Sequence, residues 1–325
     1  MKNLDIMTKR NKIWHFIVSL LALFIGLYIV HTTDNIFICI LCIVLACLLY
    51  CLIMIDPAGG WGKVFAKNTP RSRRLAEVST AITGVSFNSK DFDSNIETVT
   101  GNGKIVTHNY DVKKFDELSC VLPATINFSV ADEYKCIVRI DENLFDFLEV
   151  KEKRGKLMLS KDSKKAYFNF SATEFIMDIT APSLEEINLA GDANLNILTP
   201  LKVKKLEVNL AGSGNVDFKE ETVVDNLELS VAGSGDIIIK KGSVLVLEAD
   251  IAGSGNIVSQ ADVEYLDVNI MGSGNITAKV NSSLKYYIVG SGNIKYCGNA
   301  KLRGKTIGSG RADSVEDPSV FDKEN

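Results

Sequence analysis

A seven-membered repeat near the end of this 325-residue sequence restricts its fold more than any other feature. Each copy centres on a glycine pair or its variant and carries aliphatic residues on both sides, as in Ile251-Ala252-Gly253-Ser254-Gly255-Asn256-Ile257. The first glycine of each copy falls at residues 191, 212, 233, 253, 272, 290 and 308, so the separations are 21, 21, 20, 19, 18 and 18. Self-similarity at a nearly constant period of this length indicates a solenoid of stacked units.

Each repeat unit consists of short strands joined at sharp corners. Upstream of the glycines, apolar and polar residues alternate, as in Leu206-Glu207-Val208-Asn209-Leu210, which is typical of a half-buried strand. Paired glycines permit positive φ and a tight corner because they lack a Cβ atom. An Asn or Asp and an aliphatic residue then begin a second short strand. No stretch is long enough for a returning helix, so the sequence predicts an all-β parallel β-helix rather than a horseshoe with helices.

Stacking brings equivalent side chains into columns. We expect two aliphatic columns in the core, Leu189, Leu210, Val231, Ile251, Ile270, Ile288 and Leu195, Val216, Ile237, Ile257, Ile276, Ile294. The residue after each glycine pair is expected to form a ladder of side-chain hydrogen bonds, as stacked Asn residues do in cross-β structures. Asp236 is the odd member, because a charge is disfavoured inside a tight ladder. The predicted corner and ladder residues are Gly212, Ser213, Gly214, Asn215, Gly233, Ser234, Gly235, Asp236, Gly253, Ser254, Gly255, Asn256, Gly272, Ser273, Gly274, Asn275, Gly290, Ser291, Gly292 and Asn293.

Two apolar runs at the start of the sequence, Ile13–Val30 and Ile36–Ile55, contain no Asp, Glu, Lys or Arg. Each has roughly the 18–20 residues that a helix needs to cross the hydrocarbon layer. The sequence therefore predicts a two-span transmembrane hairpin within residues 1–60, with spans near 13–31 and 36–55. The alternatives are a buried soluble hairpin and a cleaved signal peptide. The signal peptide fits poorly because no small-residue cleavage site follows the first run.

Basic residues flank this hairpin. Four Lys or Arg precede the first run and five lie in residues 56–74 after the second, whereas the connecting loop has none. The positive-inside rule then places both termini on the cytoplasmic side. Indole rings and basic side chains favour the headgroup region, so we expect lipid contact there. The predicted interface residues are Trp14, Trp61, Lys63, Lys67, Arg71, Arg73 and Arg74.

The rest of the sequence divides into a linker, a β-rich domain and a tail. Residues 61–104 are interpreted as a basic juxtamembrane segment and linker, and residues 313–325 as a polar tail. Residues 105–312 are expected to form one β-helix domain, with the repeats at 189–312. Less regular strands should cap its N-terminal end, because an open apolar end would aggregate. These strands are expected at 115–119, 125–130, 136–140, 147–150, 156–160, 167–170 and 175–180.

The composition argues against nucleic-acid binding and catalysis. A formal net charge of −4 lacks the basic footprint of a nucleic-acid binder. The three histidines, His15, His31 and His108, all precede the repeats, and the seven cysteines form no disulfide framework. No convergent carboxylate pair of the kind used by glycan-cleaving enzymes is recognisable. We therefore predict a protein that is not an enzyme and has no catalytic residue, cofactor or metal.

An acid column is a further consequence of stacking. It comprises Glu186, Glu207, Glu228, Glu248 and Asp267. Stacked like charges are unfavourable unless they are solvated, paired with Lys or bridged by a cation. The column is therefore either a solvated, partly paired face or a weak site for a divalent cation or sugar hydroxyls.

From about residue 103 to 312 the chain resembles the putative auto-transporter adhesin family with a head GIN domain. The resemblance rests on the segments 112–118, 141–144 (Asp-Glu-Asn-Leu) and 181–184 (Ala-Pro-Ser-Leu), and on the serial Gly-Ser-Gly-Asn motif. It implies a right-handed parallel β-helix in a bacterial envelope or surface protein without established activity. Two departures are the paired spans in place of an export signal and the deviating first and last repeats, Gly191-Asp192-Ala193-Asn194 and Gly308-Ser309-Gly310-Arg311.

Three functional hypotheses follow. The first is a non-enzymatic adhesin-like module, integral to the bacterial inner membrane, that binds a protein or glycan partner on a β-helix face and has the lipid bilayer as its other partner. The second, suggested by the positive-inside count, is a cytoplasmic membrane-attached scaffold that assembles through its rod ends. The third is an enzyme acting on envelope polysaccharide. The ligand, the membrane side and the oligomeric state are not encoded in a recognisable pattern.

Overall fold

The computed structural model describes residues 98–162 and 169–316, all within one compact unit, Ser79–Asn325. The predicted spans near 13–31 and 36–55 lie outside the described residues, as do the predicted interface residues from Trp14 to Arg74. Among the described residues, no helix is long and apolar enough to cross a membrane. The transmembrane hairpin therefore stays a prediction.

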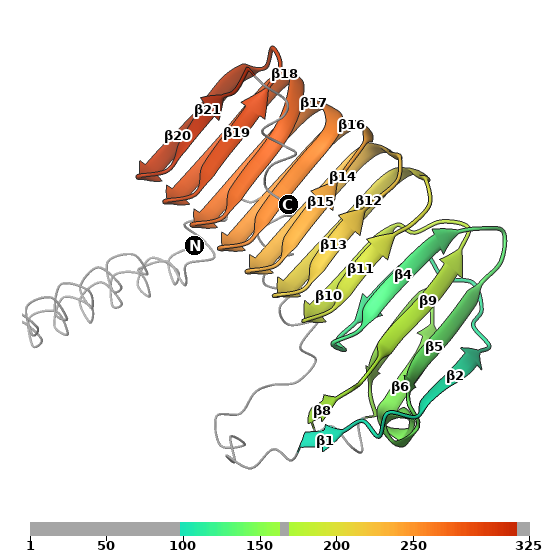
Figure 1. Ribbon diagram of the computed structural model, residues 1–325. Coiled ribbons are helices and arrows are strands. Elements are labelled where there is room, and N and C mark those ends of the chain that lie inside the picture. The colour runs from blue at the N-terminus through green and yellow to red at the C-terminus, as the bar shows by residue number, and fades with distance from the viewer. Residues whose placement is uncertain (1–97, 163–168, 317–325) are drawn as a thin grey trace, which may run out of the picture. The chain divides into compact units, whose positions relative to one another are not determined.

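Two parallel ladders of strands run through the stacked coils (Figure 1). The first contains β3 (Glu117–Cys120), β10 (Glu186–Gly191), β12 (Leu201–Gly212), β14 (Thr222–Gly233), β16 (Gly242–Gly253), the later parts of β17 (Asn256–Gly272) and β18 (Asn275–Gly290), and β20 (Lys301–Gly308). The second contains β4 (Thr125–Val130), β11 (Asn194–Ile197), β13 (Asn215–Phe218), β15 (Asp236–Ile239), the first parts of β17 and β18, β19 (Asn293–Cys297) and β21 (Arg311–Ser314).

The register of these ladders follows the repeat. Gly212 pairs with Gly233, Gly233 with Gly253, and so on to Gly290 with Gly308. Both predicted aliphatic columns lie in the core, where every member is at most 2% exposed. The prediction of an all-β solenoid is therefore confirmed, while its right-handed winding stays an expectation from the family resemblance.

The N-terminal end is built differently, from parallel and antiparallel pairs. β7 (Lys156–Lys161) extends the first ladder beyond β3 and pairs antiparallel with β6 (Leu148–Lys153). β9 (Phe175–Ala181) extends the second ladder beyond β4 and pairs antiparallel with β5 (Lys135–Asp141), which pairs in turn with β2 (Ile105–Tyr110). These antiparallel strands close the end of the solenoid at the position where the sequence predicted a cap.

Several boundaries in this region differ from the sequence prediction. Residues 142–147 form the 3-10 helix η1 (Glu142–Phe147), so the strand expected at 147–150 begins one residue later. β2 was not expected, because most of its residues are exposed and its apolar alternation is weak. β1 (Thr98–Thr100) lies inside the segment interpreted as linker and pairs with β8 (Asn169–Ser171). At the other end, β21 continues to Ser314, inside the predicted tail.

Candidate binding face

The first glycine of each repeat occupies a backbone conformation that other residues rarely adopt. Its φ is +133° at Gly212, +136° at Gly233 and between +127° and +136° at the equivalent positions up to Gly308. From Gly191 to Gly290, the carbonyl oxygen of each such glycine accepts two N–H groups from the next coil. That of Gly212, for example, accepts the N–H groups of Ser234 at 2.9 Å and Gly235 at 3.1 Å. The corners are therefore joined by backbone hydrogen bonds, in addition to any side-chain ladder.

The second glycine is required by the close approach of the coils, which also excludes a Cβ atom at the first glycine. A Cβ atom added at Gly235 would overlap the carbonyl oxygen of Gly214 and lie 2.8 Å from Cδ2 of the core residue Leu210. The same overlap with the preceding coil occurs at Gly255, Gly274 and Gly292. Stacked coils approach one another so closely at this corner that only glycine fits.

The residues after the glycines form a ladder of amide hydrogen bonds. Nδ2 of Asn275 donates to Oδ1 of Asn256 at 3.0 Å, and the backbone N–H of Asn275 donates to the same oxygen at 3.2 Å. The same pair of bonds links Asn215 to Asn194 and Asn293 to Asn275. At Asp236, only the backbone N–H donates to Asn215, because a carboxylate has no N–H group.

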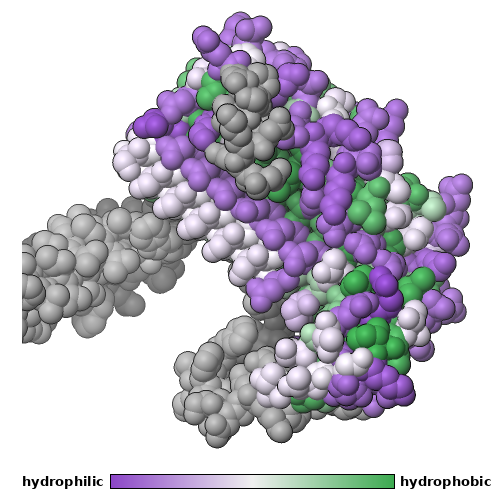
Figure 2. All heavy atoms as spheres, in the orientation of Figure 1, coloured by the Kyte–Doolittle hydropathy of each residue, from purple (hydrophilic) through white to green (hydrophobic). Residues whose placement is uncertain are grey.

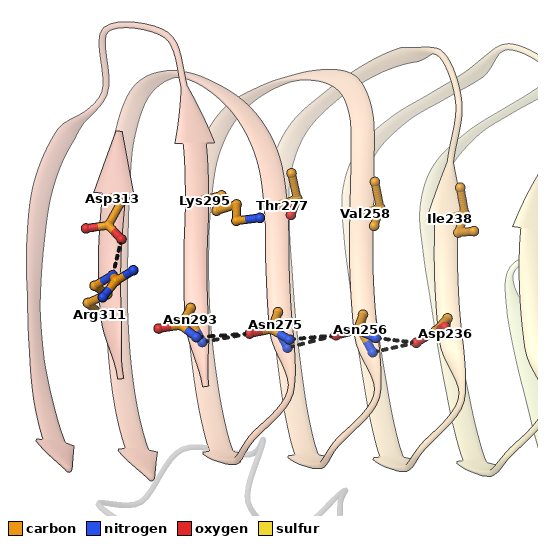
Figure 3. A pocket seen from close by; sticks show the side chains of 10 residues that line it. All are labelled: Asp236, Ile238, Asn256, Val258, Asn275, Thr277, Asn293, Lys295, Arg311 and Asp313. Atoms are coloured by element: carbon orange, nitrogen blue, oxygen red, sulfur yellow. Dashed lines mark hydrogen bonds and ion pairs between the residues drawn. The ribbon is translucent and has the colours of Figure 1, made fainter. Parts of the chain in front are cut away.

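An open groove of about 480 Å³ lies beside this ladder. Figure 3 shows two parallel rows of side chains, one formed by the ladder and the other by the residues two positions further along each strand. The second row begins with Ile238 and Val258, and charged side chains of Lys295 and Asp313 lie toward its far end. The lining residues are Asp236, Ile238, Asn256, Val258, Asn275, Thr277, Asn293, Lys295, Arg311 and Asp313.

Each ladder amide has two N–H groups, and the ladder uses one of them. For Asn256 and Asn275, the described residues supply a partner for only one N–H group of the side chain. Successive coils lie roughly 4.8 Å apart, so the edge of the groove presents donors at this spacing. At the end of the groove, Arg311 donates from Nε to Oδ2 of Asp313. The groove can therefore accept a long ligand with regularly spaced hydrogen-bond acceptors.

The acid column lies on the other ladder and is longer than the sequence analysis recognised. Pairing aligns Glu186, Glu207, Glu228, Glu248 and Asp267 as predicted. It also adds Glu117 before them and Lys285 and Arg303 after them. Glu117 was missed because it lies 69 residues before Glu186 and reaches the column only through β3.

Basic and amide groups offset the charge of this column. Nζ of Lys205 lies 3.5 Å from Oε2 of Glu207 and 3.4 Å from Oε1 of Glu228. Nζ of Lys285 lies 2.8 Å from Oδ2 of Asp267. Burial raises the pKa of Glu117 above its ordinary value, and the carboxylate of Glu186 raises it further, while Lys156 opposes the shift. These contacts describe a partly paired polar face, the first of the two interpretations that the sequence left open.

The other candidate chemical groups are buried or dispersed. Cys120, Cys136 and Cys297 are free thiols buried in the domain. Burial raises the pKa of Cys120 and of Cys136 to about 12, so both stay protonated at neutral pH. In the described part of the chain, no group of three or more His, Cys, Asp or Glu residues is arranged to hold a metal ion.

The groove was not predicted as a site, although its ladder residues were. The signal was present in the sequence, since Ile238, Val258, Thr277, Lys295 and Asp313 each stand two residues after the ladder position. This row points away from the core, and hydrophilic residues cover much of the solenoid surface seen in Figure 2. An outward row that begins with aliphatic residues and ends with charged ones is therefore distinctive.

Comparison with known proteins agrees with this architecture. Residues 114–300, more than half of the chain, match the family described as "Putative auto-transporter adhesin, head GIN domain". A putative adhesin from Parabacteroides merdae ATCC 43184 is 25% identical with a TM-score of 0.59, covering 68% of this chain and 100% of that one. A putative lipid binding protein from Parabacteroides distasonis ATCC 8503 is 28% identical with a TM-score of 0.60 and the same coverage.

A putative adhesin from Bacteroides fragilis NCTC 9343 is 21% identical with a TM-score of 0.61, covering 67% of this chain and all of its own, and it supports the fold alone. No curated protein is significantly similar to the sequence. The matched residues, the parallel coils and the repeated glycine corners show that this chain belongs to the putative auto-transporter adhesin family with a head GIN domain.

Proposed function

We propose that this protein is a membrane-anchored, non-enzymatic module of the bacterial cell envelope that binds an extended glycan in the groove beside the asparagine ladder. The observation that carries the proposal is the repetition of one N–H donor in consecutive coils, at Asn256 and Asn275, along an open groove. A glycan presents hydroxyl and ring oxygens at regular intervals, and these oxygens accept hydrogen bonds from amides.

The second row of the groove fits the same ligand class. Ile238 and Val258 offer an apolar strip to the C–H face of sugar rings, while the ladder offers polar groups to their hydroxyls. Lys295, Arg311 and Asp313 make one end of the groove polar, with Arg311 paired to Asp313, and these groups can hydrogen-bond the hydroxyls of a glycan. The similar protein described as lipid binding suggests an acyl ligand instead, but the amides and charged groups of this groove favour a polar one.

Membrane anchoring is the second part of the proposal. Its support is the pair of uncharged runs, Ile13–Val30 and Ile36–Ile55, together with the adhesin family of the β-domain. Reporter fusions after residue 325 and after the loop at residues 31–35 test the hairpin and its orientation. Opposite activities of an exported reporter at the two positions support a membrane span between the loop and the C-terminal fusion. Equal activities contradict the hairpin.

Binding is tested with the full-length chain and a panel of soluble bacterial capsular and cell-wall polysaccharides. Val258→Arg places a long charged side chain in the groove and is expected to weaken binding at least about tenfold. Val289→Arg makes the same change at an outward position on the other ladder and serves as the matched control. Equal binding by the two variants, or no binding by the wild-type chain, contradicts the groove as a glycan site.

A further inference from the structure

The amide ladder divides into two runs at Asp236. In the first run, Nδ2 of Asn215 donates to Asn194, and in the second each of three asparagines donates from Nδ2 to the coil before it. Between the runs, the side chain of Asp236 has no N–H group, and only its backbone N–H donates to Asn215, at 3.1 Å. The second run, from Asp236 to Asn293, consists of the ladder residues that line the groove.

The second row of side chains changes character at the same coil. Asn196 and Asp217 occupy this row in the two preceding coils, and Nζ of Lys240 lies 3.4 Å from Oδ2 of Asp217. Ile238 follows Asp217 in the stack. One coil before the groove, the carboxylate therefore stands in the second row and is paired with a base. At the first coil of the groove it stands in the ladder row, as Asp236, beside an apolar side chain.

One oxygen of Asp236 is available to a ligand. Oδ1 accepts both bonds from Asn256, and the described part of the chain supplies no donor to Oδ2. The side chain is half-buried and lines the groove next to Ile238, at one end of the ladder row in Figure 3. A carboxylate oxygen has two lone pairs and donates nothing, so Oδ2 can accept the hydrogens of two sugar hydroxyls.

The basic groups that line the groove lie at its other end. Lys295 stands in the third coil after Asp236, and Arg311 in the fourth is paired with Asp313. Three coils span roughly 14 Å, which exceeds the screening length of about 8 Å at physiological ionic strength. The carboxylate of Asp236 therefore gives the first coil of the groove a local negative charge.

Resting on the proposed glycan-binding function, we propose that Asp236 determines which glycans the groove accepts. Its Oδ2 accepts hydrogen bonds from adjacent hydroxyls of a neutral sugar unit, and its charge disfavours a unit that carries a carboxylate or sulfate. The next two coils then donate from Asn256 and Asn275 to oxygens of the same chain. Asparagine at position 236 would restore the ladder bond to Asn215, so ladder stability does not account for the carboxylate.

The test measures binding of the full-length chain to two polysaccharides that differ only in charge. The pair is a polysaccharide that the wild-type chain binds and a derivative made by reducing its uronic carboxylates or by oxidising its primary hydroxyls. The wild type is expected to prefer the neutral form. Asp236→Asn should bind that form about tenfold more weakly, because it loses a charge-assisted acceptor, and should lose the preference.

Asp217→Asn is the matched control, since it makes the same change one coil outside the groove and should leave binding of both forms unchanged. Urea denaturation of each variant reports whether its fold is kept. The preference of the wild type should also weaken as salt rises, because exposed charges are screened.

The outcomes separate this inference from the proposed function. Asp236→Asn that binds both forms as the wild type does overturns the role of Asp236, and the groove remains a glycan site if Val258→Arg still weakens binding. A wild-type preference for the acidic form overturns the role as well. Absence of binding by the wild-type chain across the whole polysaccharide panel contradicts the proposed function and this inference together.

Discussion

Oδ1 of Asp236 accepts two hydrogen bonds from Asn256, at 2.8 Å from the backbone nitrogen and 2.9 Å from Nδ2. The equivalent distances at Asn275 and Asn293 are between 3.0 and 3.3 Å. A carboxylate is a stronger acceptor than an amide, which accounts for the shorter bonds. The cost appears on the other side, where Asp236 has no N–H group to donate to Asn215.

Replacing Asp236 by Asn is expected to leave stability unchanged or raise it by up to about 1 kcal/mol, because the variant gains one amide hydrogen bond and loses a charge-assisted one. Urea denaturation measures the change. Asn275→Asp is the matched control, since it removes a donor from an intact rung and should destabilise the protein. A clear fall in the melting temperature of Asp236→Asn contradicts the ladder interpretation.

Both glycines of a corner are expected to resist substitution, because a Cβ atom at either would overlap a carbonyl oxygen of the preceding coil, and the first glycine also has a positive φ. Gly235→Ala forces a Cβ against the carbonyl oxygen of Gly214 and Leu210, and should cost about 1–3 kcal/mol by overpacking. Gly233→Ala strains a backbone with a φ of +136° and should cost about 1–3 kcal/mol. Ser234 stands between the two glycines and its side chain is exposed, so Ser234→Ala is the control and should change stability by less than about 0.5 kcal/mol. Equal stability of all three variants in urea denaturation is the contrary result.

The buried thiols predict a loss of stability in alkali. The pKa of Cys120 and of Cys136 is raised from 9.0 to about 12 by burial. The unfolded chain therefore releases these protons at a lower pH than the folded chain, so their contribution is complete below pH 9 and is lost as pH rises toward 12. Denaturation between pH 8 and 10.5 should show a shallower decline in Cys120→Ala/Cys136→Ala than in the wild type. Identical slopes contradict the shift.

Asp141 predicts a loss of stability in acid. Burial alone raises the pKa of Asp141, but N–H groups of Thr173 and Gly103, which donate to its two oxygens at 2.7 Å each, outweigh burial and lower the pKa. The stabilisation is present above the ordinary carboxyl pKa and is lost as pH falls through the lowered value. Asp141→Asn should lower the melting temperature at pH 7 and reduce its acid dependence. Glu142→Gln, at an exposed ion pair with Lys104, is the control and should have little effect.

Much of the solenoid could be predicted because equivalent residues of successive repeats pair with one another, so the repeat alone defines the strand register. Once Gly212 and Gly233 are recognised as equivalent, Leu210 must lie over Val231 and Asn215 beneath Asp236, and the buried columns follow. The N-terminal strands were harder, because nothing in residues 105–110 repeats and the strand they form is mostly exposed. Its partner, β5, is distant in sequence, so only the folded chain reveals the pairing.

The candidate site shows the same division. The ladder side of the groove was predictable from the residue after each glycine pair. The groove itself also needs the second row of side chains, and its depth depends on how neighbouring coils place that row beside the ladder. The entry of Glu117 into the acid column is a second example, because it depends on β3 joining β10 across 69 residues.

The sequence by itself determined the glycine corners, the period and the inward aliphatic columns, because each depends on local backbone freedom and on alternation within one repeat. Only the tertiary structure decided how the solenoid begins, where its core is left uncovered at Leu302, and which outward rows border a groove. Those features arise from pairings between distant segments, whose free energy depends on shape and burial that no local pattern records.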